Sequence, residues 1–167
     1  MDYFISDLHL FHDDVIRYEN RPFDNVEHMH IEIIKRHNSV VHQHDTVFVM
    51  GDVSFGNKEK TESIIKQLNG KLILIKGNHD RNRSNTWFYD VGFNHVSEWP
   101  IIYKDFFILS HEPMYVNENM PYVNIHGHLH KTDWVSKRFM NVSMENWNYT
   151  PVSFDKVKEY FGIKEED

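Results

Sequence analysis

The sequence predicts an α/β fold whose sheet becomes mixed toward the C-terminus, and three observations support this prediction. Short β-rich runs recur along the chain, and three of them are continuously apolar, as expected for strands covered on both faces. Helical patterns separate the early runs, whereas the later part consists mostly of strand-like runs. No internal repeat, low-complexity tract or linker interrupts the chain, so we expect one domain over residues 1–167.

The β-rich runs and the helical patterns can each be placed on the chain. The predicted strands span residues 3–6, 46–51, 71–77, 105–110, 123–127 and 138–144. The first predicted helix runs to about Val40, because Asp24 and Glu27 have the spacing of a capping box. The other two helices, within 57–70 and 153–162, each open on a capping side chain and close on a glycine.

The composition excludes several classes of protein. With 40% apolar and 14% aromatic residues, the chain can build a core, so disorder is not expected. The absence of cysteine rules out disulfides, thiolate zinc sites and a cysteine nucleophile. The apolar runs of the chain are far too short to span a membrane, and the opening "MDYFISD" is acidic, unlike a signal peptide. We therefore expect a cytoplasmic protein with no membrane partner.

The charge and the histidine content bear on possible partners. The formal net charge is −7 and no basic face is evident, so we expect no extended nucleic-acid surface. Thirteen histidines favour metal binding or acid–base chemistry, because histidine is the commonest residue in both roles. The sequence does not indicate an oligomeric state.

Polar motifs follow five of the predicted strands: "SDLHL", "GDVSFG", "GNHD", "SHEP" and "GHLH". Ligands of open α/β sheets collect at the carboxyl ends of the strands, so these motifs should converge. They supply oxygen donors and imidazoles but no sulfur, which suits manganese, iron, zinc or related divalent ions. Seven candidate ligands exceed the need of one ion but match two ions that share a carboxylate. They are Asp7, His9, Asp52, Asn78, His111, His128 and His130.

The ordered set D-x-H, GD, GNHD, H-x-P and GHxH resembles the calcineurin-like metallophosphoesterase superfamily. The motifs extend from Asp7 to His130, about three-quarters of the chain. The resemblance implies a four-layer α-β-β-α sandwich with two mixed sheets and a dinuclear metal centre. Because "GDVSFG" and "GNHD" lack the "DRG" and the closing glutamate of the protein phosphatase branch, the resemblance does not favour that branch or the diadenosine tetraphosphatases.

The resemblance also implies a role for each motif residue. The first ion would be held by Asp7, His9, Asp52 and His130, and the second by Asn78, His111 and His128, with Asp52 as the bridge. His79 would bind no metal; it would contact the substrate phosphate and protonate the leaving oxygen. Manganese is the expected metal, with iron, zinc, nickel and cobalt as alternatives.

The implied function is metal-dependent hydrolysis of phosphate esters. Two ions would generate a hydroxide that attacks phosphorus in line. We expect a phosphodiesterase acting on small or nucleotide-like substrates. A phosphomonoesterase of the same mechanism and a metal-bound interaction module without catalysis are the alternatives. A nuclease is a third, which the short intervals between motifs and the missing basic face disfavour.

Residues near the motifs allow weaker predictions. His12, Arg21 and Arg81 are candidates for phosphate contact, although each arginine could instead make a surface or structural contact. Met114, Tyr115 and Met120 lie in a loop after His111; they could stack a base or pack, and packing is favoured.

Two sets of histidines fall outside the ligand pattern. His126 is expected to be a hydrogen-bonded neighbour of the metal ligands. The group from His28 to His44 is interpreted as a solvated helix face and loop, since no strand end with a carboxylate accompanies it.

Overall fold

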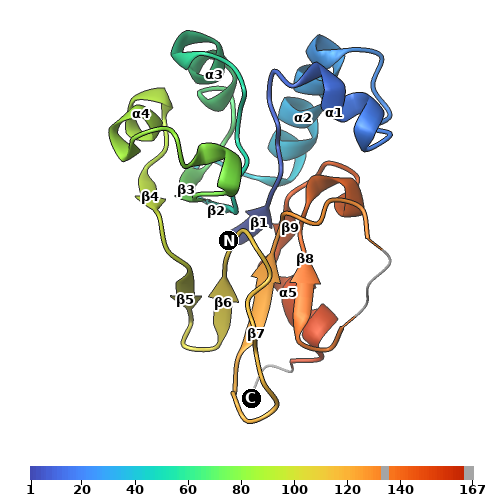
Figure 1. Ribbon diagram of the computed structural model, residues 1–167, viewed down its shortest axis with the longest axis vertical. Helices are drawn as coiled ribbons and strands as arrows, with labels where there is room; N and C mark the ends of the chain where they lie inside the picture. The colour runs from blue at the N-terminus through green and yellow to red at the C-terminus, as the bar shows by residue number, and fades with distance from the viewer. Residues whose placement is uncertain (133–135, 164–167) are drawn as a thin grey trace.

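The computed structural model describes residues 1–132 and 136–163, and it contains two mixed sheets (Figure 1). The strands are β1 Asp2–Ile5, β2 Thr46–Val49, β3 Lys71–Ile75, β4 His95–Ser97, β5 Ile101–Tyr103, β6 Phe107–Leu109, β7 Val123–His126, β8 Phe139–Asn141 and β9 Val152–Ser153. The first sheet has the order β4-β3-β2-β1-β9 and the second β5-β6-β7-β8. Among the strands of the described residues, only β9 in the first sheet and β5 in the second pair antiparallel to their neighbours.

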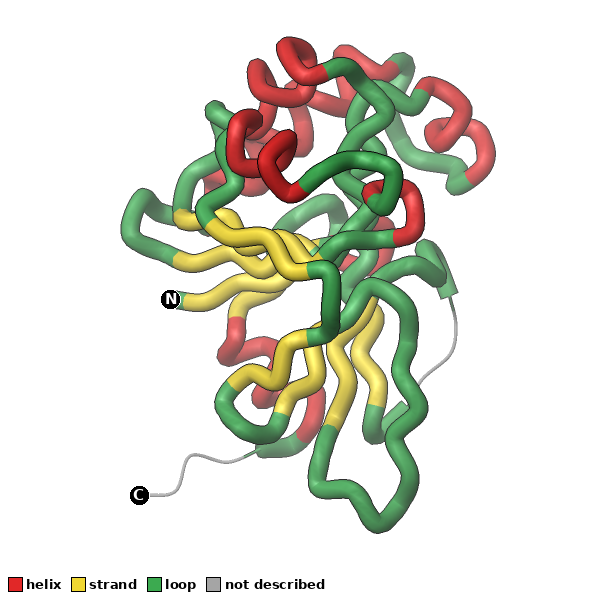
Figure 2. Tube along the Cα trace, turned by 60° about the vertical axis from the view of Figure 1, so that its left-hand side comes forward, coloured by secondary structure: helices red, strands yellow, loops and turns green. Residues whose placement is uncertain are grey.

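The helices lie on both sides of the first sheet. They are α1 Asp13–Tyr18, α2 Val26–Val40, α3 Lys58–Ile65, α4 Asn85–Val91 and α5 Phe154–Phe161, with short 3-10 helices η1 Asn78–Asp80 and η2 Met144–Trp147. Helices α1 to α4 cover one face of that sheet, while α5 and the second sheet lie on the other side (Figure 2). The prediction of an α/β fold with two mixed sheets is confirmed.

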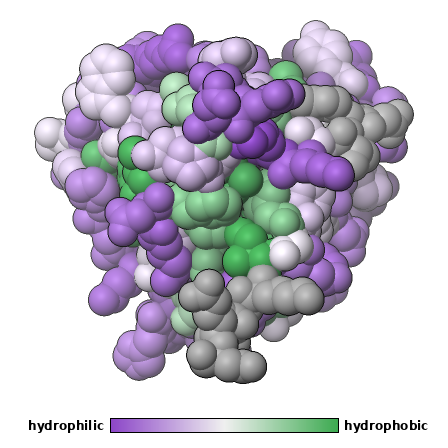
Figure 3. Space-filling model, turned by 90° about the horizontal axis from the view of Figure 1, so that it is seen from below, coloured by the Kyte–Doolittle hydropathy of each residue, from purple (hydrophilic) through white to green (hydrophobic). Residues whose placement is uncertain are grey.

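Two hydrophobic cores explain the continuously apolar strands. Side chains alternate between the faces of a strand, so Ile5 packs toward the helices while Phe4 packs toward the second sheet. Val47 and Phe48 of β2 divide between the two cores in the same way. Val157 of α5 belongs to the core between the sheets. Apolar side chains also gather in the middle of the lower surface, flanked by polar ones (Figure 3).

The helix caps largely follow the sequence. Asn57 and Ser153 cap α3 and α5 as predicted, each accepting a hydrogen bond from the backbone N–H three residues on. The start of α2 differs from the prediction, because Asn25 rather than Asp24 caps it by accepting from the N–H of His28. The Asp24 carboxylate instead lies 3.1 Å from the His28 ring. No helix in the described ranges is both long and apolar enough to cross a membrane.

The histidines between His28 and His44 correct one expectation. His42 and His44 are exposed, but His30 and His37 are buried, so the group is not a solvated face throughout. The Nε2 atom of His30 accepts a hydrogen bond from a backbone N–H at 3.0 Å, and that of His37 donates to a backbone carbonyl at 2.9 Å. Both rings fit the core because hydrogen bonds satisfy them there.

Candidate metal centre

The carboxyl ends of β1, β2, β3, β6 and β7 are each followed by one of the five polar motifs, at the edge where the sheets meet. The backbone joins the sheets there. The N–H of Ser6 donates to Val142 O at 3.1 Å, and the N–H of Met144 donates to Ser6 O at 3.1 Å. Gly127 is pressed against this junction, because a Cβ built on it would lie 1.9 Å from Ser6 Oγ. Only glycine permits so close an approach, which brings loops of both sheets together.

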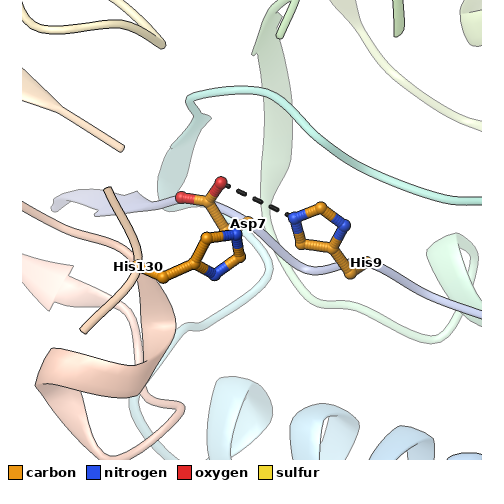
Figure 4. Close-up of side chains that lie close together, drawn as sticks. All are labelled: Asp7, His9 and His130. Atoms are coloured by element: carbon orange, nitrogen blue, oxygen red, sulfur yellow. Dashed lines mark ion pairs between the residues drawn. The ribbon is translucent and has the colours of Figure 1, made fainter. Parts of the chain in front are cut away.

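Six of the seven predicted ligands gather into two groups, and within each group the candidate ligand atoms lie within 4.8 Å of one another. The first group is Asp7, His9 and His130 (Figure 4), and the second is Asp52, His111 and His128. Asn78 joins the second, because its Oδ1 lies 2.9 Å from His111 Nε2 and 3.1 Å from His128 Nδ1. Asp52 Oδ2 faces both groups, at 3.7 Å from His9 Nε2 and 3.4 Å from His111 Nε2.

Most of these residues have an unusual backbone. Left-handed φ angles of 61°, 48°, 55°, 68° and 45° occur at Asp7, His9, Asp52, His128 and His130. Such angles are uncommon outside glycine, although aspartate and histidine tolerate them better than most residues. Each costs on the order of 1 kcal/mol or more and persists only where the surroundings impose it, which is typical of functional sites.

Three buried polar atoms of the first group have no hydrogen-bond partner among the described residues. They are Asp7 Oδ1 and both ring nitrogens of His9. The other carboxylate oxygen of Asp7 accepts from the His128 N–H at 2.9 Å and from Ser143 Oγ at 2.7 Å. A buried polar atom without a partner is unfavourable, and a divalent ion would supply a partner for Asp7 and one for His9. The donor set therefore fits such an ion.

Glu145 of η2 is a functional candidate that no sequence motif marked. Its Oε1 lies 3.0 Å from His130 Nδ1 and 2.6 Å from Arg21 Nη2, and its side chain is 3% exposed. A carboxylate in this place holds the ring and leaves Nε2 of His130 with the lone pair. Burial is the largest influence and opposes a charge on His130, but the carboxylates of Glu145, Asp7 and Glu19 together outweigh it and raise the pKa of the ring.

The expectation that Arg21 contacts a substrate phosphate is wrong. Its side chain has 0% exposure, and its guanidinium donates to Glu145 and to the carbonyls of Asp7 and Leu8 at 2.7 and 3.0 Å. The forked guanidinium that suits phosphate here serves a buried carboxylate and the backbone. Arg21 therefore supports the loop that carries Asp7 and His9.

The candidate ligand atoms of the second group lie close together, and a proton on His128 Nδ1 can form a hydrogen bond with only one of the others. His111 Nδ1 donates to Met50 O at 2.7 Å, which leaves Nε2 with the lone pair. That atom lies 2.9 Å from Asn78 Oδ1 and 3.1 Å from His128 Nδ1. These short separations place the donor atoms around one point.

Asp80, the last residue of "GNHD", ties two of the motif loops together. Its buried carboxylate accepts hydrogen bonds from the N–H groups of Asp52 at 2.8 Å, Val53 at 3.1 Å and Gly77 at 2.9 Å. The carboxylate of Asp80 thus fixes the loops after β2 and β3, although it belongs to neither side-chain group.

His79 lies at the open side of the centre. Its N–H donates to Asp52 Oδ1 at 3.0 Å, and its side chain is 49% exposed with Nε2 at 3.9 Å from Asp52 Oδ2. The centroid of the Phe55 ring lies 5.1 Å from the centroid of the His79 ring and 4.3 Å from that of the His12 ring. His12 therefore stands beside the centre, where the sequence placed it.

Two other predictions concern Arg81 and the loop after His111. Arg81 is exposed and its Nη2 lies 3.0 Å from Glu112 Oε1. Tyr115 is 84% exposed and Met114 38%, so the interpretation of this loop as packed is wrong for both.

His126 is set apart from the two histidines that follow it. It is fully buried and belongs to neither group, whereas His128 and His130 each join one. Its Nδ1 donates to Gly127 O at 2.8 Å, and burial lowers the pKa of its ring. This position agrees with the expected hydrogen-bonded neighbour of the ligands.

Comparison with known proteins decides the family. The sequence profile of the calcineurin-like phosphoesterases matches residues 3–160. The chain belongs to this family. The resemblance drawn from the five motifs is thus confirmed. Together with the two side-chain groups, membership in the calcineurin-like phosphoesterases indicates a metal-dependent phosphoester hydrolase.

Relatives and solved structures agree with this membership. The chain is 36% identical to an uncharacterised protein of Methanocaldococcus jannaschii, with 93% of this chain and 88% of the relative covered. It is 29% identical to the Gene 66 protein of Mycobacterium phage L5, with 93% and 91% covered. A protein of unknown function from Aquifex aeolicus superimposes with a TM-score of 0.73 at 25% identity, covering 95% of this chain and 98% of that one.

A more distant structure shares the fold alone. Nuclease MPE of Pseudomonas putida superimposes with a TM-score of 0.52 at 22% identity. The match covers 77% of this chain and 60% of the nuclease.

Proposed function

We propose that the chain is a phosphodiesterase that acts on small or nucleotide-like diesters with two divalent ions bound. The observation that carries this proposal is Asp52, whose Oδ2 faces a histidine of each side-chain group. One ion would be held by Asp7, His9, Asp52 and His130, and the other by Asp52, Asn78, His111 and His128.

The donor types support a particular set of metals. Two divalent ions, when bound, lower the pKa of water and draw charge from the phosphoryl oxygens. Manganese suits mixed carboxylate, amide and imidazole donors, and iron, zinc, nickel and cobalt are alternatives. The chain itself positions these donors. Five of them lie at residues with left-handed φ angles, and the close approach at Gly127 brings the loops of both sheets together.

His79 is proposed as the proton donor to the leaving oxygen. Its exposed ring stands beside Asp52 and can reach a substrate at the open side. The hydrogen bond from the His79 N–H to the Asp52 carboxylate fixes the position of His79 relative to the proposed bridging carboxylate. General acid catalysis by such a group contributes roughly 10²–10⁴-fold in rate. His12 and Arg81 remain proposed substrate contacts.

The charges around the centre favour a diester over a monoester. A monoester carries up to two negative charges on its phosphate and needs more cationic partners than a diester. Arg21 is turned inward toward Glu145, and Arg81 is paired with Glu112. Both arginines flanking the motifs are therefore engaged by carboxylates, which leaves less positive charge for a phosphate dianion.

Hydrolysis of bis(p-nitrophenyl) phosphate with manganese tests this proposal. We expect turnover that a chelator abolishes. His79→Ala should lower kcat roughly 10²–10⁴-fold, and Asp52→Ala should lower both the rate and the metal content. Full turnover in both variants would overturn the mechanism.

The alternatives are separate outcomes of the same screen. Turnover of p-nitrophenyl phosphate without turnover of diesters would indicate a monoesterase. Metal binding without turnover of any ester would indicate an interaction module. Cleavage of single-stranded nucleic acid would indicate a nuclease, the activity named for the Pseudomonas putida structure. The cytoplasmic location stays a prediction.

A further inference from the structure

A groove extends from His111 along the loop that follows it. A cavity of about 330 Å³ is lined by His111, Lys76, Arg81, Glu112, Met114 and Tyr115. A second hollow of about 320 Å³ shares Lys76 and Arg81 and adds Trp99. Because they share lining residues, the two hollows form one groove that begins at a proposed metal ligand. Its size is that of a site for a small ligand.

The groove carries no net charge in its lining. Arg81 Nη2 lies 3.0 Å from Glu112 Oε1, and Lys76 Nζ lies 3.3 Å from Glu98 Oε1. The ammonium of Lys76 also donates to a backbone carbonyl at 2.7 Å and to a side-chain amide oxygen at 3.1 Å, so three acceptors engage its three donors. Both cations are engaged, which suits an uncharged polar group better than a second phosphate.

Two large aromatic side chains stand exposed along this groove. Tyr115 is 84% exposed and Trp99 is 76% exposed. The backbone of Trp99 and the residue before Tyr115 are nevertheless held by hydrogen bonds: the hydroxyl of Ser97 donates to Trp99 O at 2.7 Å, and the N–H of Met114 donates to Asn124 Oδ1 at 2.7 Å. Exposed rings on anchored backbones can stack a flat ligand with little loss of conformational entropy.

We propose that this groove is a nucleoside-binding subsite, so that the substrate is a nucleotide ester whose phosphate lies at the metal centre. This inference rests on the proposed function. The base would stack on Tyr115, which lines the same cavity as His111, while the sugar hydroxyls and the polar edge of the base would meet the Arg81–Glu112 pair. Neutrality, flat aromatic surfaces and continuity with His111 together match a nucleoside.

The kinetic test uses two diesters that differ only in the base. Thymidine 5′-ethyl phosphate and its analogue with hydrogen in place of the base share the same reacting atoms, and ³¹P NMR follows both. With manganese-loaded protein, we expect kcat/KM to be roughly tenfold higher for the thymidine ester. Tyr115→Ala should remove most of this preference through KM, Tyr115→Phe should keep it, and the abasic ester should respond to neither. Tyr18→Ala, which removes a similarly exposed tyrosine on α1, is the matched control.

A binding measurement separates this inference from the proposed function. Calorimetry with thymidine 5′-monophosphate and with inorganic phosphate measures binding affinity without turnover. We expect Tyr115→Ala to weaken binding of the nucleotide roughly tenfold and to leave that of phosphate unchanged. If neither ester is hydrolysed but this difference persists, the proposed function fails and the subsite stands. Equal kcat/KM for both esters, or equal loss for both ligands in Tyr115→Ala, would overturn the subsite.

Discussion

The two halves of the candidate metal centre are built differently. In the first group, Asp7 Oδ1 and the ring nitrogens of His9 are buried without a hydrogen bond in the described residues. In the second group, His111 Nε2, Asn78 Oδ1 and His128 Nδ1 lie within 2.9 to 3.1 Å of one another, so a proton on His128 can form a hydrogen bond inside the group. The first group instead draws its order from outside, through the ion pairs of Glu145 with His130 and Arg21. An ion should therefore stabilise the first group more than the second.

The largest expected effect distinguishes the three neighbouring histidines at the end of β7 and just after it. We expect His128→Ala and His130→Ala each to lose one ion from its own group and almost all activity, because each contributes to a different group. His126→Ala should lose much less, since His126 belongs to neither group. Metal content per chain after dialysis, measured together with the hydrolysis rate, checks this. A loss in His126→Ala as large as in the other two would show that the division is wrong.

The next effect tests the outside support of the first group. Glu145→Gln keeps the shape but removes the charge that orients His130, so manganese affinity of the first group should fall roughly 10–100-fold. Affinity of the second group should stay unchanged, which would appear as one altered phase in a manganese titration followed by EPR. Glu112→Gln, which removes an exposed carboxylate paired with Arg81, is the matched control. Equal weakening of both phases would argue against separate support.

A smaller effect concerns the coupling of metal to stability. Manganese at about one hundred times its Kd should raise the free energy of unfolding by about 2.7 kcal/mol per ion if the unfolded chain does not bind it. Asp7→Asn should reduce this gain more than Asn78→Ser, because the buried carboxylate oxygen without a hydrogen bond lies in the first group. Chemical denaturation with and without manganese measures the gain. If Asp7→Asn and Asn78→Ser reduce the manganese-dependent gain in the free energy of unfolding equally, the proposed difference between the two groups is wrong.

The smallest effect lies outside the centre, at the buried histidines of α2. Burial lowers the pKa of His30 and His37 below the usual 6.5, so the unfolded chain takes up more protons near that pH. Their stabilising contribution should be present above pH 6.5 and decline as the pH falls below it. Urea unfolding of metal-free protein at several pH values measures this slope. His37→Asn should flatten it, whereas replacement of the exposed His44 should leave it unchanged.

Much of the fold could be predicted because its signals are local. Continuous apolar runs marked β2, β3 and β6, and capping side chains marked α3 and α5. The helices and strands without a predicted counterpart are short: α1 has six residues, α4 has seven, β4 and β5 have three each, and β9 has two. Segments of this length carry too little periodicity to be recognised, and tertiary contacts decide their conformation.

The sequence by itself determined which residues meet at the candidate site. The five motifs named all seven candidate ligands, because each motif follows a strand and strand ends converge in this class of fold. Only the tertiary structure decided what surrounds them. Arg21 and Glu145 are 124 residues apart, so no local pattern could show that their charges meet beneath His130. The exposure of Tyr115 likewise depends on which side chains reach it in the folded chain, which spacing along the sequence does not record.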